Sequence, residues 1–213
     1  MTTTISRLYD SPQAASQAVR DLEGAGVPSS DISVVASNAD NWYAGDGSRK
    51  TRKIDRDMDG TDDRAESAGV GAGLGAVLGG TAGLLAGLGL MAIPGLGPVV
   101  AAGWLVATAT GALAGGAAGG IIGALTAAGV TKEDAEVYAE GIRRGGTLVC
   151  ARVPDADGAR YEAILDQSAV NIRERAESYR EAGWSGFDPS ARPFDAEQVR
   201  TEREMYRDRS MPR

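Results

Sequence analysis

The chain has 213 residues, with 22 Lys and Arg against 29 Asp and Glu, one cysteine and no histidine. A disulfide within the chain is therefore excluded, and so is a metal site built from histidines or from several cysteines. The acidic balance offers no clustered excess of basic side chains for phosphates, so we expect no nucleic-acid partner. The first residues, MTTTISRLYD, lack the basic and then apolar layout of a secretory signal, and a reducing cytoplasmic setting fits best.

Residues 1–37 have the pattern of the first half of an α+β domain. A short strand is predicted for residues 5–9, and Ser11 with Pro12 then supplies a cap and a first-turn proline for a helix. Apolar residues at 15, 18, 19 and 22 follow the helical period, and glycines at 24 and 26 end the helix. A second strand, DISVVAS, is predicted for residues 31–37, so this half has the order β-α-β.

Residues 38–66 form a polar linker that contains an acidic loop, DRDMDGTDDRAE. The loop satisfies the calcium-binding pattern D-x-[DN]-x-[DN]-G-x5-E. Position eight, normally apolar, is Asp62, and the preceding SRKTRKI is too basic and short for a convincing entering helix. The alternative is a solvated linker whose carboxylates favour the N-terminus of the next helix. The predicted calcium ligands are Asp55, Asp57, Asp59, Thr61, Asp63 and Glu66.

An uncharged interval of 65 residues, from Ser67 to Thr131, holds nineteen of the thirty glycines. We predict that residues 67–130 form an antiparallel hairpin of two helices, 67–93 and 98–129, joined by a turn at AIPGLGP. Glycine at every fourth position lowers helix propensity but gives a smooth face on which helix backbones approach closely. The predicted helix-packing rows are Gly71, Gly75, Gly79, Gly83 and Gly87 in the first helix and Gly111, Gly115, Gly119 and Gly123 in the second.

This hairpin is long enough to cross a bilayer. At about 1.5 Å per residue the helices measure roughly 40 and 50 Å, against a hydrocarbon core of about 30 Å. Insertion would be driven by Trp104 and the large aliphatic residues, because Gly and Ala are nearly neutral. The basic stretch SRKTRKIDR before the first helix then places both termini in the cytoplasm. We expect an inner-membrane location and a homo-oligomer; the alternative is a hairpin buried in a soluble cytoplasmic oligomer.

Residues 131–187 have the pattern of the second half of the α+β domain. Thr131 and Asp134 mark a helix N-terminus, Arg143 and Arg144 favour its C-terminal end, and two glycines then stop it. A strand at 146–153, a helix from 155 and a short fourth strand at 170–172 follow. Joined across the hairpin, the two halves give β-α-β-β-α-β, the ferredoxin-like order, with the hairpin inserted between the second and third strands.

Four phrases of the sequence are shared with a known family: LYDSPQAASQAVRDLEGAGVPSSDISVVA, AIPGLGPVVAAGW, YAEGIRRGGTLV and REAGWSGFDP. On these residues the chain resembles the bacterial general stress proteins, also called heat-induced stress proteins. The resemblance covers residues 3–187 and consists of structural phrases without catalytic signatures. It implies a role in the stress response and no established enzymatic activity.

Residues 188–213 form a polar tail with a helix that Asp195 can cap. Its apolar content, mainly Val199, Met205 and Tyr206, is too small for independent stability. We therefore expect a solvated tail, with a docking helix for another subunit as the alternative.

Catalysis has little support in the sequence. Cys150 lies within an apolar strand and has no histidine partner, so a small buried side chain is expected there. The glycine runs near residue 71 lack the Lys-Ser/Thr of a phosphate loop. Trp184 is expected to plug the sheet domain, with partner binding as its alternative role.

Three functional hypotheses remain. The first is a stress-associated, membrane-anchored interaction protein that self-associates through its glycine hairpin and binds a protein partner that the sequence does not identify. The second is a regulatory module that responds to calcium or another small ligand. The third is an oligomeric pore formed by several hairpins. An enzyme ranks below all three.

Overall fold

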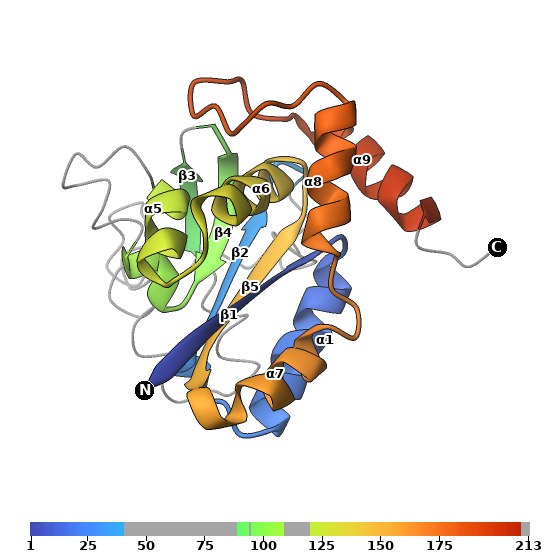
Figure 1. Cartoon of the computed structure of the whole chain (residues 1–213). Helices are drawn as coiled ribbons and strands as arrows, with labels where there is room; N and C mark the ends of the chain where they lie inside the picture. The colour runs from blue at the N-terminus through green and yellow to red at the C-terminus, as the bar shows by residue number, and fades with distance from the viewer. Residues whose placement is uncertain (41–88, 94, 109–119, 210–213) are drawn as a thin grey trace, which may run out of the picture.

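The computed structural model describes residues 1–40, 89–93, 95–108 and 120–209, and it shows an α+β fold (Figure 1). The N-terminal part contains β1 (Thr2–Tyr9), α1 (Pro12–Gly24) and β2 (Ile32–Ser37). A hairpin of β3 (Gly89–Ile93) and β4 (Gly97–Ala102) follows. The remaining elements are α5 (Gly120–Ala127), α6 (Lys132–Arg143), β5 (Thr147–Pro154), α7 (Gly158–Leu165), α8 (Ile172–Glu181) and α9 (Ala196–Arg209).

The strands form one five-stranded sheet in the order β1-β5-β2-β4-β3, and every neighbouring pair is antiparallel. Two consequences follow from this pairing. Strands β1 and β2 are parallel to each other with β5 between them, and α1 connects them. Strands β2 and β3 are also parallel, with β4 between them. The predicted α+β class is therefore confirmed, whereas the ferredoxin-like order as a whole is not.

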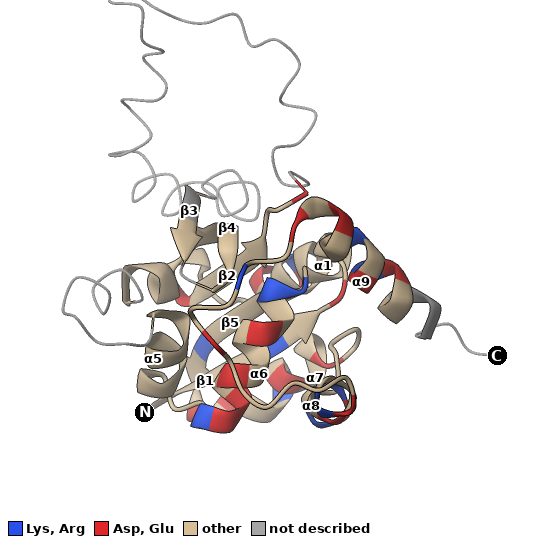
Figure 2. Ribbon diagram, turned by 90° about the horizontal axis from the view of Figure 1, so that it is seen from above, with Lys and Arg blue, Asp and Glu red and all other residues tan. Residues whose placement is uncertain are grey.

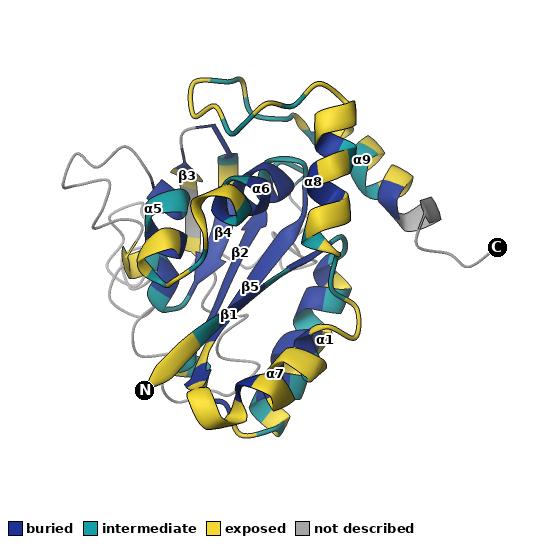
Figure 3. Ribbon diagram, viewed as in Figure 1, coloured by how far each residue is buried: buried dark blue, intermediate teal, exposed yellow. Residues whose placement is uncertain are grey.

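Alternate side chains of the sheet enter two separate cores. Val149 and Ala151 of β5 pack with α1 and α7, whereas Leu148 and Cys150 pack with α5 and α6. The central part of the sheet is consequently buried on both faces, whereas the start of β1 and the outer sides of the helices are exposed (Figure 3). A third, smaller cluster joins α6, α8 and α9.

The helix ends follow the sequence signals. The Ser11 hydroxyl accepts the Ala14 N–H at 3.1 Å, and the Thr131 hydroxyl accepts the Asp134 N–H at 3.2 Å. Helix α6 ends at Arg143, and Gly145 shortly after it has a φ of 102° that an L side chain rarely adopts. The predicted starts and the predicted stop are confirmed at these positions.

The predicted fourth strand at residues 170–172 is wrong. One hydrogen bond, from the Val170 N–H to the Leu8 carbonyl at 2.8 Å, joins this segment to β1. Asn171 instead caps α8, because its side chain accepts the N–H groups of Arg173 and Glu174. An asparagine that satisfies two helix N–H groups favours the cap over a strand.

The predicted pair of long helices, 67–93 and 98–129, is contradicted by the β3–β4 hairpin. The turn between the predicted helices does exist, and it joins two strands: Gly95 and Gly97 have φ values of 77° and 83°, and the Leu96 N–H donates to the Ile93 carbonyl at 3.0 Å. The sequence shows no alternation of apolar and polar residues in these strands, because both of their faces carry apolar residues. The strands could therefore not be told from a helix by their pattern.

Trp104, expected to favour membrane insertion, is fixed at the end of β4 within the α+β domain. Its indole N–H donates to the Asp31 carbonyl at 3.2 Å, and the Arg152 guanidinium lies 4.7 Å from its ring centroid. Gly103 makes this turn possible, since a Cβ there would lie 2.3 Å from the Ile32 carbonyl oxygen.

The expectation of a solvated C-terminal tail is wrong for α9. The Val199 side chain is 0% exposed and that of Tyr206 is 8% exposed, so one face of the helix is docked. Asp195 caps the helix as predicted, because its carboxylate accepts the N–H groups of Glu197 and Gln198.

Candidate functional site

A charged groove of about 1060 Å³ lies where β1 ends and α9 docks. Its walls come from the turn between β1 and α1, from the loop between α7 and α8, from α8 and from α9. Asp40, the last described residue after β2, also lines it. The groove therefore brings the end of β1 and the C-terminal helix α9 together with Asp40, which precedes residues 41–88.

Two ion pairs hold the walls of the groove in place. Arg175 of α8 makes a bidentate pair with Asp10 at 2.8 and 2.7 Å, and its guanidinium lies 3.5 Å from the ring centroid of Tyr206. Arg203 of α9 pairs with Asp40 and donates to the Gly145 carbonyl at 2.8 Å. These contacts tie α8 to β1, and α9 to the residues that follow β2.

The N-termini of α1 and α8 also border the groove. Ser11 and Asn171, their caps, both line it. Each cap side chain already accepts N–H groups of its own helix. The remaining positive potential of two helix ends is partly offset by Glu174 and Glu204 in the walls.

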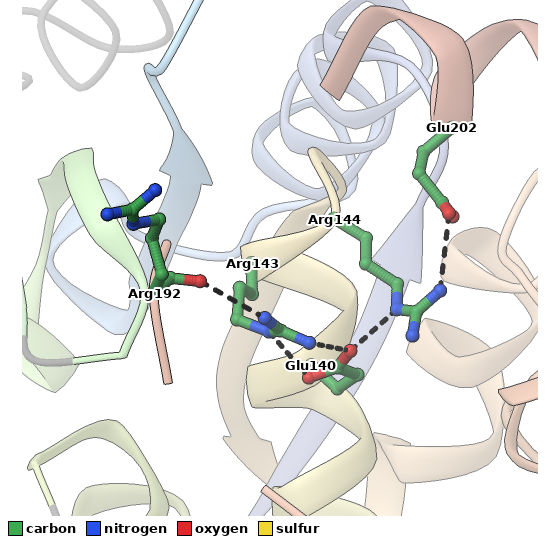
Figure 4. A network of polar contacts seen from close by, with 5 residues as sticks. All are labelled: Glu140, Arg143, Arg144, Arg192 and Glu202. Atoms are coloured by element: carbon green, nitrogen blue, oxygen red, sulfur yellow. Dashed lines mark hydrogen bonds and ion pairs between the residues drawn. The ribbon is translucent and has the colours of Figure 1, made fainter. Parts of the chain in front are cut away.

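The buried carboxylate of Glu140 holds α9 in place beside the groove. We call this carboxylate and the residues around it the α9 seat (Figure 4). Glu140 is 1% exposed and accepts hydrogen bonds from Arg143 at 2.6 and 2.8 Å and from Arg144 at 2.6 Å. Arg144 continues to Glu202 of α9 at 3.2 Å, and Arg143 donates to the Arg192 carbonyl at 3.4 Å. One carboxylate of α6 thus organises both the α8–α9 loop and α9.

Aromatic rings complete this seat. The Arg144 guanidinium lies 4.4 Å from the Tyr179 ring centroid, and that of Arg143 lies 4.6 Å from the Phe194 ring centroid. Burial alone would lower the pKa of Arg144, but the hydrogen bond and charge of Glu140 outweigh it, so the pKa is raised. Arg144 therefore stays charged, and the network is a fixed ionic contact.

The residues of this seat include three buried polar atoms without a hydrogen-bond partner in the described part of the chain, and one of them is the Tyr179 hydroxyl. The other two are Glu202 Oε2 and Arg203 Nη2. An unpaired buried polar atom costs about 1–3 kcal/mol. These unpaired atoms therefore reduce the stability that the docking of α9 provides.

Cys150 is a buried side chain, as predicted. It is 0% exposed, and its sulfur lies 3.2 Å from the Ser6 hydroxyl. Burial raises the pKa of the thiol to about 12, which the contact with Ser6 only partly offsets. A thiolate nucleophile is not available at this position at neutral pH.

Most of the other predicted site residues lie outside the described residues. This applies to the six calcium ligands from Asp55 to Glu66 and to every predicted packing glycine except Gly123. Within residues 1–40, 89–93, 95–108 and 120–209, no three His, Cys, Asp or Glu side chains gather into a metal site. Gly123 lies in α5, where an added Cβ would meet no atom within 4 Å.

Membrane spans can be assessed only for the described part of the chain. There, no helix combines the length and the hydropathy that crossing a bilayer requires.

Part of the groove could be recognised from the spacing of residues in α9. Val199, Arg203 and Tyr206 are spaced at i, i+4 and i+7, which puts them on one face of α9. That spacing identifies a docked face. It does not reveal which distant residues, such as Asp10 and Asp40, complete the ion pairs.

Comparisons with protein-family models, with curated proteins and with solved structures found no match. The resemblance to the general stress proteins therefore stays a prediction.

Proposed function

We propose that the chain is a stress-associated interaction protein that acts without catalysis and self-associates through its uncharged glycine-rich segments, 67–88 and 109–119. The observation that carries this proposal is glycine at every fourth residue from Gly71 to Gly87. Such a row lets two backbones approach closely, so that dispersion and weak C–H···O contacts accumulate. The α+β domain supplies a folded platform on which both segments begin and end.

The strand topology bears on whether these segments cross a bilayer. Asp40 and Gly89 flank residues 41–88, and the strands next to them belong to one sheet. The chain between them would have to cross a membrane an even number of times. Its uncharged part, 67–88, has length for about one crossing of roughly 20 residues. This favours packing against protein over the predicted membrane anchor, which we keep as the alternative.

Sedimentation of the full chain, with and without detergent, tests the proposal. We expect a multiple of the 21.9 kDa chain mass in detergent-free buffer. The variant Gly75→Leu/Gly79→Leu/Gly83→Leu is expected to weaken association at least tenfold, because leucine holds the backbones apart. Gly24→Leu is the matched control, since a Cβ at this end of α1 meets no atom within 4 Å.

Two results would contradict the proposal. A parent that sediments as a monomer at all concentrations would exclude self-association. A parent that dissolves only with detergent would favour the membrane-anchored alternative, and ion flux through reconstituted liposomes would then favour the pore.

A second candidate function is regulation by a small ligand. It is favoured by the groove, whose Asp40–Arg203 pair links α9 to the chain fifteen residues before the predicted calcium loop begins at Asp55. Calcium titration monitored by thermal unfolding tests it. Asp55→Ala/Glu66→Ala is expected to abolish any calcium-dependent shift, and Asp155→Ala/Glu177→Ala, at two exposed positions, to retain it. An unchanged response in the first variant would remove calcium as the ligand.

We also propose that the sheet is a modified ferredoxin-like unit. Support comes from β1, α1 and β2, which place β5 between two parallel strands as one half of that fold does. The β3–β4 hairpin lies where this fold has no strands, and residues 170–172 do not complete its outer edge.

A further inference from the structure

One half of the sheet has an apolar face whose burial is not accounted for by the described helices. On the α1 side, α1 and α7 contact β1 and β5, and their core extends to Val34 and Ala102. The register places Ala36 opposite Val100 on this same side. Ala36 is 0% exposed and Val100 is 3% exposed, yet neither belongs to the cores under α1 and α7 or under α5 and α6.

The side chains of this face that the structure describes are small. Ala92 of β3, opposite Pro98, lies on the same side as Val100, since residues two apart on a strand share a face. Neutral residues with short side chains leave room for a neighbour with large ones. Figure 2 shows the contrast between these uncharged strands and the mixed charges on α6 and α9.

The connection from β2 to β3 has to return along the sheet. Because the two strands are parallel, the chain leaves β2 at Ser37, opposite Val99, and re-enters at Gly89, opposite Ala101. Val99 and Ala101 are two residues apart on β4, so the return covers about 7 Å along the strand direction. The other side of β3 and β4 is already packed with Ile121 and Leu125 of α5. The side that carries Ala36 and Val100 is therefore the one available for the return.

The uncharged segment 67–88 has a matching pattern. On a helical wheel of 100° per residue, its large residues fall within about 120°, and the glycine row lies on the opposite side. A helix of this length measures about 33 Å, more than enough for the return. The large residues are Val70, Leu74, Val77, Leu78, Leu84, Leu85 and Leu88.

We infer that residues 67–88 pack their large aliphatic stripe on the α1-side face of β2, β4 and β3 of the same chain, and turn the glycine row outward to a second copy. The inference rests on the proposed self-association and gives it an orientation. In this arrangement the large side chains cover Ala36, Val100 and Ala92. The glycine row then remains free for close approach between copies.

Disulfide trapping tests the inference. Ala92→Cys, at an exposed position of β3, is combined in turn with Leu74→Cys, Val77→Cys or Leu84→Cys from the stripe. The matched controls combine it with Gly75→Cys, Gly79→Cys or Gly83→Cys from the glycine row. Cys150 stays in place, because it is fully buried, and Ala92→Cys alone measures its interference. Mixed isotope-labelled copies separate disulfides within a chain from those between chains.

We expect at least one stripe pair to form an intrachain disulfide ten times faster than every glycine-row pair. Equal rates at stripe and glycine positions would overturn the inference, and so would the absence of any intrachain disulfide. Disulfides only between chains would assign the face to the 67–88 segment of a second copy. Sedimentation of the reduced Ala92→Cys variant is measured in parallel. If the variant is a monomer but disulfides form selectively at the stripe positions, only the proposed self-association is contradicted. If the variant is an oligomer and no such selectivity is seen, only the inferred packing is contradicted.

Discussion

Glu140 shows how one residue can fix the position of an entire C-terminal segment. Its carboxylate is 1% exposed, whereas Arg143 and Arg144, which bind it, have side chains 14% and 13% exposed. Burying a carboxylate is unfavourable unless its charge is paired and its oxygens accept hydrogen bonds. Here both oxygens accept, and the two arginines extend the contact to the Arg192 carbonyl and to Glu202.

Glu140→Gln is therefore expected to destabilise the chain strongly. The amide keeps the side-chain shape but leaves two partly buried guanidinium groups without their shared anion, at a cost of about 3 kcal/mol. Urea unfolding checks this value. Glu177→Gln, on the exposed side of α8, is the control and should change the stability by less than about 0.5 kcal/mol. Equal effects of the two variants would show that the Glu140 network contributes no specific stability.

Cys150 predicts a defined dependence of stability on alkaline pH. Burial raises the pKa of the folded thiol from 9.0 to about 12. The folded state thus binds the proton more tightly than the unfolded state, so this contribution is complete below pH 9 and is lost as the pH rises toward 12.

Between pH 7 and pH 10 the parent should lose about 1 kcal/mol more stability than Cys150→Ala, since one pKa unit corresponds to about 1.4 kcal/mol. The variant also removes a buried sulfur, but that cost does not vary with pH. The informative quantity is therefore the difference between the two pH profiles measured by urea unfolding. Parallel profiles would mean that the thiol ionises equally in both states.

At the scale of elements, α9 is docked but incompletely satisfied. Val199 fills the space at Gly145, where an added Cβ would lie 2.6 Å from its Cγ1. Glu202 Oε2 and Arg203 Nη2 lack partners among the described residues. An element with few buried apolar side chains and unpaired polar atoms opens more readily than a core strand.

Val199→Ala should accordingly increase cleavage by trypsin at Arg200 and Arg203 about tenfold or more, because the loss of a buried aliphatic group shifts α9 toward its undocked state. Met205→Ala, at a side chain 38% exposed, is the control and should leave the rate close to that of the parent. Cleavage that precedes any loss of strand signal in circular dichroism would locate the opening in α9. If cleavage and the loss of the strand signal occurred at the same time, α9 would not open separately from the rest of the domain.

The elements that could be predicted from the sequence are those with one buried face. Helix α1 and helix α6 have clear caps and a helical apolar period, and both begin at the predicted residues Ser11 and Thr131. The β3–β4 hairpin could not be recognised, because apolar residues on both faces give no period of two. The groove could not be predicted either. Its ion pairs join Asp10 to Arg175 and Asp40 to Arg203, which only the fold brings together.

At the scale of the whole molecule, a single sheet serves two cores. The neighbouring residues Leu148 and Val149 of β5 are both 0% exposed, and they point into the α5–α6 core and the α1–α7 core respectively. Because β5 lies between β1 and β2, loss of packing on either face removes support from the strand that both cores share. The two cores should therefore unfold together.

Leu148→Ala and Val149→Ala test this coupling as a pair. Each is expected to cost about 2–4 kcal/mol from lost burial and the cavity left behind. In each variant, native-state hydrogen exchange should show that the slowest amides of β1, β2 and β5 all lose the same opening free energy, since these amides exchange only through global unfolding. If Val149→Ala accelerated exchange only in α1 and α7, the two faces would be separate cooperative units. The sheet would then act as a boundary between them, and a ligand at the groove end of β1 would stabilise one face without the other.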